Sequence, residues 1–219
     1  MGRESDDRYR QTLRERLRDS FSNTYLTLLS IIQGTALALL FGKIDNLTER
    51  NAFHVPQAIL ALGLFLIIAL LWHQYQIGLV LYAWVPQLVD ALVPFSLGAC
   101  EFVAILGLQH GALTTTVTLS LFFFFAIFAF EYQYAQVARA ELEEPPVFAR
   151  TFRFWDLLVC IASAVLLLIA SALMRAPWPG DSESIAGGVT VVLVAAMHGV
   201  RQAIQWHIAR RYMRDRAPV

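Results

Sequence analysis

Long apolar segments alternate with short polar ones along the chain. From residue 21 onward there are six apolar segments, each with about the 20 residues that a helix needs to cross a hydrocarbon core. They cover residues 21–41, 57–81, 86–108, 112–137, 154–174 and 185–207. A helix satisfies its backbone hydrogen bonds internally, which lipid requires of an open segment. The pattern therefore predicts an all-α integral membrane protein with six transmembrane helices.

A polar, arginine-rich segment precedes the first span. Within residues 5–20, Tyr9, Leu13 and Leu17 recur at intervals of four, and Ser5 can cap a helix. We expect a short amphipathic cytoplasmic helix that leads into the membrane. The chain then divides into this arm (1–20), a transmembrane domain (21–209) and a basic cytoplasmic tail (210–219).

Basic residues predict the orientation. Arginines concentrate in the arm, in the connection after the fourth span and in the tail: Arg3, Arg8, Arg10, Arg14, Arg16, Arg18, Arg139, Arg150, Arg153, Arg210, Arg211, Arg214 and Arg216. The opposite side holds Lys43, Arg50 and Arg175. Six spans put all three arginine-rich segments on one face, which the positive-inside rule makes cytoplasmic. The arginine pattern and the short chain favour a bacterial inner membrane.

The amino-acid composition agrees with a membrane protein and makes several classes of function unexpected. Hydrophobic residues make up 57% of the chain and charged residues 16%, against about 45–50% and 25% in soluble domains. The net charge is zero, and the basic clusters lie beside spans, so we expect lipid contacts and no nucleic acid. Cys100 and Cys160 lie in apolar segments without metal-ligand spacing. No enzyme motif is present, so neither catalysis, a metal nor a cofactor is expected.

Ionisable residues inside the spans are candidates for function, because charge is costly in lipid. They are His73, Asp90, Glu101, Glu131, Asp156, His198 and Arg201. Arg201 needs a partner, and Glu131 or Asp90 lies at a compatible depth. An ion pair that fixes the bundle is the favoured interpretation, ahead of a proton or ion relay.

Glu101 lies well inside the third span, where a carboxylate must be protonated, paired or in contact with water. His198 is one conceivable partner. A cation or proton site is an equally open interpretation. Haem ligation by His73 and His198 is a minor alternative.

The first span carries a polar stripe at helical spacing, formed by Asn23, Thr27, Ser30 and Gly34. Such residues often let helices pack closely and hydrogen-bond. The alternative is a wet pore wall in which Leu28 and Ile32 form an apolar constriction, since such constrictions can gate by dewetting.

Three short motifs in the first half of the chain resemble one family of channels. Residues 18–23 read Arg-Asp-Ser-Phe-Ser-Asn, residues 72–75 Trp-His-Gln-Tyr, and residues 92–95 Leu-Val-Pro-Phe. They are similar to motifs of the endolysosomal-type potassium channels that lack a P-loop, whose bacterial members are short six-helix subunits. The resemblance implies a homotetramer whose first helices line the pore, with Leu28 and Ile32 at the constriction. The family's motif aspartate is Asn23 here, so potassium selectivity is not implied.

We therefore expect a subunit of an oligomeric ion channel, with cations as the conducted species. A membrane adaptor or sensor in a multi-protein bacterial system such as phage defence is the second hypothesis, with the charged arm binding a cytoplasmic protein. A proton-coupled transporter that uses Glu101 is the third.

Overall fold

The computed structural model describes residues 2–81, 88–139, 147–176 and 181–215, and this part of the chain is helical throughout apart from short turns. The six helices are α1 (Gly2–Glu49), α2 (Val55–Leu81), α3 (Leu88–Gly107), α4 (Ala112–Arg139), α5 (Val147–Leu173) and α6 (Ser182–Asp215). The all-α prediction is confirmed.

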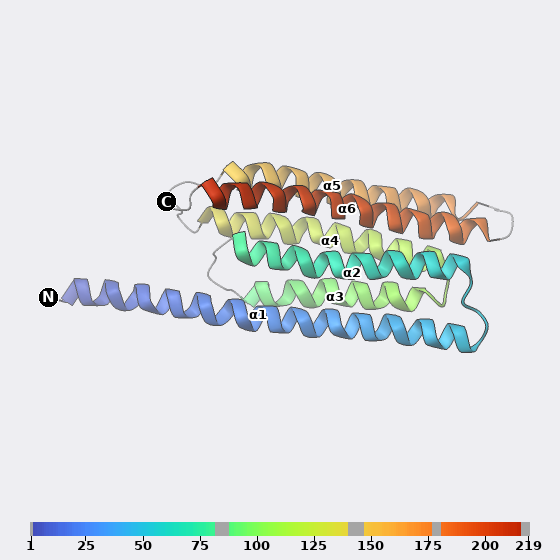
Figure 1. Ribbon diagram of the computed structural model, residues 1–219, viewed down its shortest axis with the longest axis horizontal. Helices are drawn as coiled ribbons and strands as arrows, with labels where there is room; N and C mark the ends of the chain where they lie inside the picture. Colours follow the sequence, from blue (N-terminus) through green and yellow to red (C-terminus); the bar gives the residue numbers. More distant parts are fainter. Residues whose placement is uncertain (1, 82–87, 140–146, 177–180, 216–219) are drawn as a thin grey trace.

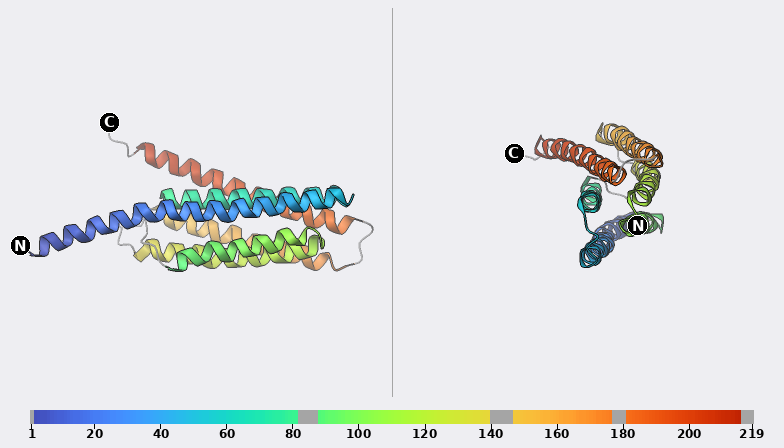
Figure 2. Two further views of the ribbon diagram at one scale, coloured as in Figure 1. Left: turned by 90° about the horizontal axis from the view of Figure 1, so that it is seen from below. Right: turned by 90° about the vertical axis from the view of Figure 1, so that its right-hand side faces the viewer.

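The helices lie side by side and alternate in direction (Figure 1). α2 packs mainly against α6, α4 packs against α5 and α3, and α1 packs against α3 and α2. The start of α1 and the end of α6 lie at the same end of the bundle, where the first part of α1 extends beyond the other helices (Figures 1 and 2). The amphipathic character of this extension stays a prediction, because nearly all of its side chains lie outside the described residues.

Five of the helices are long and apolar enough to cross a membrane, namely α1, α2, α4, α5 and α6. In α3 the apolar stretch whose side chains are described covers Leu92–Gly107. The helix ends at Gly107, one residue before the predicted limit of 108, because the chain reverses in the turn that leads to Gly111, whose φ is 104°. The structure therefore supports a helical membrane protein with five such helices, and a sixth span remains an expectation, as does the orientation.

α1 continues beyond the predicted limit of residue 41, because the polar side chains near its end form hydrogen bonds with the turn between α3 and α4. Lys43 donates a hydrogen bond to Gln109 (2.9 Å), which in turn donates to Asn46 (3.2 Å). The helix closes in a Schellman motif, with Asn51 left-handed at φ 53° and Ala52 N–H bonded to Leu47 O at 2.8 Å. These contacts fix α1 to the turn between α3 and α4.

Glycines permit the close contact of α2 with α6. A Cβ on Gly63 would lie 2.6 Å from Val191 Cγ1 and 3.2 Å from the backbone nitrogen of Val192. On the other side, a Cβ on Gly188 would lie 3.2 Å from the backbone nitrogen of Leu60. Neither position has room for a side chain, so the two helices touch nearly backbone to backbone, as small residues allow in membranes.

Substitution of Gly63 by valine tests this contact. We expect Gly63→Val to lower the stability of the detergent-solubilised protein by about 1–3 kcal/mol, because added bulk must push α2 away from α6. Gly42→Val is the matched control, since a Cβ on Gly42 meets nothing within 4 Å in the described structure. Thermal unfolding followed by tryptophan fluorescence measures both. Equal melting temperatures for the two variants would contradict the close packing.

Candidate functional site: a buried polar network and the outer face of α1

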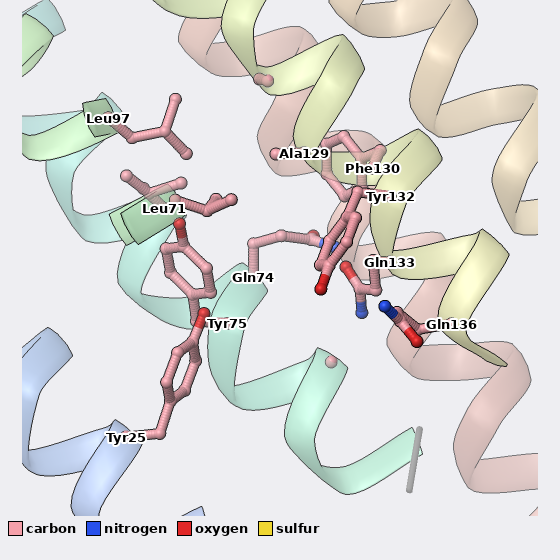
Figure 3. Close-up of a pocket in the computed structure, with 13 residues that line it drawn as sticks. Tyr25, Leu71, Gln74, Tyr75, Leu97, Ala129, Phe130, Tyr132, Gln133 and Gln136 are labelled. Atoms are coloured by element: carbon pink, nitrogen blue, oxygen red, sulfur yellow. The ribbon is translucent and has the colours of Figure 1, made fainter. Parts of the chain in front are cut away.

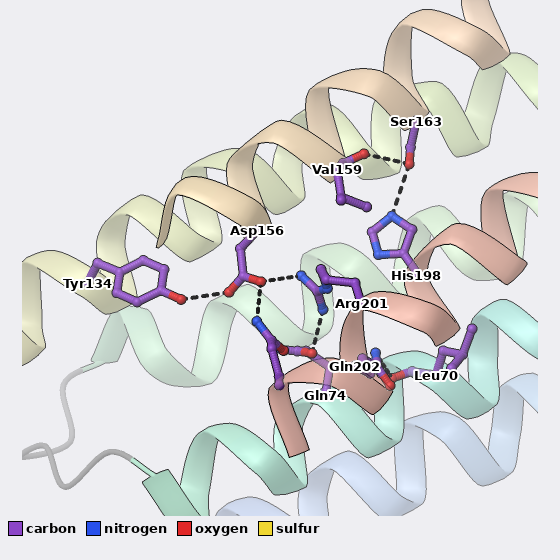
Figure 4. A network of polar contacts seen from close by, with 10 residues as sticks. Leu70, Gln74, Tyr134, Asp156, Val159, Ser163, His198, Arg201 and Gln202 are labelled. Atoms are coloured by element: carbon purple, nitrogen blue, oxygen red, sulfur yellow. Dashed lines mark hydrogen bonds and ion pairs between the residues drawn. The ribbon is translucent and has the colours of Figure 1, made fainter. Parts of the chain in front are cut away.

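The centre of the bundle holds an ion pair between Asp156 on α5 and Arg201 on α6. Arg201 Nη1 lies 2.5 Å from Asp156 Oδ1, and the two side chains are only 5% and 2% exposed. Tyr134 donates to Asp156 Oδ2 (2.6 Å) and Gln205 to Oδ1 (2.5 Å), while Arg201 Nη2 donates to Gln74. Four helices thus meet at one carboxylate and one guanidinium (Figure 4).

Arg201 is therefore paired with Asp156, and the two partners suggested by depth are not used. Glu131 forms a separate ion pair with Arg153 at 2.5 Å, in which the side chains are 37% and 53% exposed. The side chain of Asp90 lies outside the described residues. The depth of a residue in the membrane does not show which helices are neighbours. Arg201 pairs with Asp156 because α6, which carries Arg201, lies beside α5.

Two histidines, His73 and His198, lie near this ion pair, and each has a partner of its own. His198 Nε2 is 3.0 Å from Ser163 Oγ, and its ring stacks on Phe123 with centroids 4.7 Å apart. His73 Nδ1 is 2.9 Å from the side-chain oxygen of Gln202. Among the described residues, no group of three or more histidine, cysteine or acidic side chains could hold a metal ion. The arrangement gives no particular support to haem ligation.

Glu101 belongs to a second polar cluster, between α1 and α3. Its Oε2 accepts a hydrogen bond of 3.1 Å from Gln33, and the two residues are 1% and 4% exposed. His198 is not its partner, because His198 lies against α4 and α5. Glu101 Oε1 and the nearby hydroxyl of Tyr75 have no partner among the described residues. With no cation beside it in this part of the chain, the carboxyl group is suited to the protonated form.

A small cavity lies between α1, α2, α3 and α4 (Figure 3). Its volume is about 60 Å³, and its polar lining consists of neutral groups: Tyr25, Gln74, Tyr75, Tyr132, Gln133 and Gln136. A second cavity of about 40 Å³ shares Gln74 with the first and reaches His198 and Arg201. Apart from Gln202 in the second cavity, the remaining lining of both cavities is apolar, with Leu71, Ala126 and Phe130 shared between them. Tyr75 lines the first cavity and lies near Glu101. Gln74 lines both cavities and accepts a hydrogen bond from Arg201.

The predicted pore-lining residues of α1 separate into two groups. Thr27, Ser30 and Gly34 are exposed on the outer side of the bundle, and a Cβ on Gly34 would meet nothing within 4 Å in the described structure. Ile32 is only 7% exposed and fits against Gly98, whose added Cβ would lie 2.6 Å from Ile32 Cγ2. Leu28 is half-buried. The side chain of Asn23 lies outside the described residues.

The exposed face of α1 contains further residues that the sequence pattern did not single out. Ile31 is 61% exposed, and Thr35, Ala38 and Gly42 are exposed as well. Thr35 satisfies its hydroxyl on the carbonyl of Ile31 (2.8 Å). A signal for these positions was available, since residues 27, 31, 34, 35, 38 and 42 follow the i, i+3, i+4 spacing of one helical face.

No protein-family model, curated protein or solved structure matches this chain.

The buried ion pair predicts a large difference between two conservative substitutions. Asp156→Asn should lower the free energy of unfolding by about 3–5 kcal/mol, because it leaves Arg201 charged and unpaired in the interior. Glu131→Gln removes one member of the exposed pair and should cost about 0–1 kcal/mol. Unfolding of both variants in detergent, followed by circular dichroism, measures the contrast. If Asp156→Asn were as stable as Glu131→Gln, the central role of the pair would be wrong.

Proposed function

We propose that the protein is the subunit of an oligomeric cation channel in which copies of α1 surround the conduction path. The observation that carries this proposal is the outer face of α1. It presents Thr27, Ser30, Gly34, Thr35 and Ala38, which are polar or small, at positions where one subunit alone would expose them to lipid.

The outer faces of other helices have the opposite character. α4 exposes Leu121, Phe124, Phe125 and Phe128, and α5 exposes a similar series of large apolar side chains. Large apolar side chains suit lipid, whereas small and hydroxyl-bearing residues are typical of surfaces at which membrane helices pack together. The contrast supports the proposal that α4 and α5 lie on the lipid side of an assembly and α1 at its centre.

Hydroxyl groups and a carboxylate support cations as the conducted ions. Thr27 and Ser30 offer oxygen atoms along the path, and the exposed Asp45 lies near the end of α1. Rings of acidic side chains favour cations at the mouths of channels. We include a tetramer in the proposal because the motifs in the first half of the chain resemble those of a tetrameric channel family.

The packing of α1 changes which residues are the best candidates for the proposed constriction. Because Ile32 packs inside its own subunit, a polar replacement there would disturb the contact of α1 with α3 as well as any pore. Ile31, on the exposed face, is the better candidate for an apolar ring, with Leu28 beside it.

Cysteine modification tests the pore directly. In a protein whose Cys100 and Cys160 are replaced by alanine, we expect Ser30→Cys to conduct potassium or sodium in proteoliposomes. Block by a charged, water-soluble thiol reagent should exceed tenfold, because the reagent places a bulky cation in the path.

Ile161→Cys is the matched control, since Ile161 is 48% exposed on α5 and should face lipid. Flux that is insensitive to the reagent at Ser30→Cys, or equally sensitive at both positions, would contradict a pore lined by α1. Loss of flux in Glu101→Gln together with a dependence on a proton gradient would instead indicate a proton-coupled transporter.

One structural feature favours the adaptor function as a second candidate. α1 continues as a helix beyond the bundle, which gives a partner an accessible helical arm (Figure 2). Deletion of residues 2–18 should then abolish co-purification of a soluble protein from the native host while the bundle remains intact. An identical set of co-purified proteins with and without the arm would count against this role.

A further inference from the structure

Gln33 and Glu101 form the polar centre of the contact between α1 and α3. Their side chains are buried, and Gln33 Nε2 donates a hydrogen bond to Glu101 Oε2 at 3.1 Å. Beside them Ile32 fits against Gly98, so the pair lies within a closely packed junction. One ionisable carboxyl group therefore lies inside the contact that attaches α1 to the bundle.

The hydrogen bonds of this pair are incomplete unless the carboxyl group carries a proton. Gln33 Oε1 and Glu101 Oε1 are both buried and have no partner among the described residues. Each shares a carbon atom with one of the two bonded atoms, so both oxygens lie at the same junction. An amide oxygen and a carboxylate oxygen only accept hydrogen bonds, whereas a protonated carboxyl group also donates one. A proton on Glu101 would supply the missing donor.

The titratable groups near Glu101 are neutral. They are the thiol of Cys100 on its own helix and the hydroxyl of Tyr75 on α2. Tyr25 of α1 lies against Tyr75, with ring centroids 6.0 Å apart (Figure 3). His73 of α2 instead faces α6, where it forms a hydrogen bond. None of these groups offers a positive charge to a carboxylate at this point.

The charged residues of the neighbouring helices lie at other levels. Thr115 of α4 bonds to the carbonyl oxygen of Ala104 (3.1 Å), which fixes the register of α4 on α3. Counted from that register, Glu131 lies about three turns beyond the level of Glu101, and Lys43 lies about three turns further along α1 than the glutamine. Neither ion pair of the described residues involves Glu101. An isolated carboxylate in such surroundings is costly, and the group takes up a proton instead.

We propose that Glu101 is a proton-binding site whose proton completes a two-bond pair with Gln33 and so holds α1 against α3. The protonated group accepts from Gln33 Nε2 and donates to Gln33 Oε1. When hydroxide from the solution takes the proton and forms water, a buried carboxylate faces the amide oxygen. Repulsion between these acceptors and the cost of the buried charge then separate the two helices. The attachment of α1 therefore depends on pH, whether or not α1 lines a pore.

Infrared spectroscopy detects this proton directly. The full chain in detergent is labelled with ¹³C at the side-chain carboxyl of glutamate, and Glu101 is the one buried glutamate among the described residues. We expect an isotope-shifted C=O band of a protonated carboxyl group at neutral pH, where glutamates in water are ionised. Glu101→Gln should lose this band. Glu131→Gln, which removes a more exposed carboxylate, is the matched control and should keep it.

Hydrogen exchange of the backbone shows whether the proton holds α1. In Glu101→Gln the new amide accepts and donates as the protonated acid does, so both bonds to Gln33 persist at every pH. At about pH 9 we expect peptides of residues 27–40 to exchange about tenfold faster in the native protein than in Glu101→Gln, because α1 opens more easily. At about pH 6 the two proteins should exchange equally, and peptides of α5 should match under both conditions.

Three results would overturn the proposal. Absence of the protonated-carboxyl band in the native protein at neutral pH would show that Glu101 is ionised. Equal exchange of α1 in the native protein and Glu101→Gln at alkaline pH would show that the proton does not hold the helix. Loss of the band when sodium replaces a bulky organic cation would indicate a bound metal ion in place of the proton.

A second comparison keeps the test decisive if Glu101→Gln does not fold, which size-exclusion chromatography checks. The infrared band of the native protein then reports the proton. Exchange of α1 and α5 is compared in the native protein and in Glu131→Gln, and in both we expect alkaline pH to accelerate α1 more than α5. Equal acceleration of the two helices would contradict the proposal.

Discussion

The arrangement of the bundle depends on the ion pair between Asp156 and Arg201. Two charges removed from water are costly, and they are tolerated in the interior only when they face each other and their remaining hydrogen bonds are made. Here Tyr134, Gln205 and Gln74 supply those bonds. The requirement fixes the rotation of α5 and α6 about their axes and brings α2 and α4 to the same point. The apolar faces of α4 and α5 are thereby turned outward.

α1 and α3 are attached to this core by contacts of a different kind. Gln33 bonds to Glu101, Ile32 fits against Gly98, and Lys43 bonds to Gln109. No ion pair of α1 with another helix is found among the described side chains. Helix α1 is thus held by close packing and by hydrogen bonds in which at most one partner is charged, and its polar and small residues lie exposed on the outer side. The proposed channel needs both parts, namely a charged core that fixes the fold and a less charged outer helix.

The all-helical fold was predictable from the sequence, because a run of about 20 apolar residues has few alternatives to a helix in lipid. The limit of α1 was less predictable than that of α3, which ends at Gly107 against a predicted 108. α1 continues to Glu49 through side-chain bonds to Gln109, which depend on tertiary contacts.

The pairing of polar residues could not be predicted from depth alone. Seven ionisable positions were recognised as candidates, yet the partner of Arg201 depends on α5 being its neighbour, and the partner of Glu101 depends on α1 facing α3. Thr27, Ser30 and Gly34 of the polar stripe are all exposed on the outer side of α1. Ile32 lies on the opposite side of the helix, because Gly98 offers it a space that no pattern within α1 reveals.

The central claim is that copies of α1 face one another across the axis of an oligomer. Oxidative cross-linking of Ser30→Cys in native membranes, with Cys100 and Cys160 replaced by alanine, tests it most directly. We predict rapid formation of a covalent dimer at Ser30→Cys and none at Ile161→Cys, because only the first position lies between subunits. A protein that remains monomeric at Ser30→Cys, or that cross-links equally at both positions, would contradict the account.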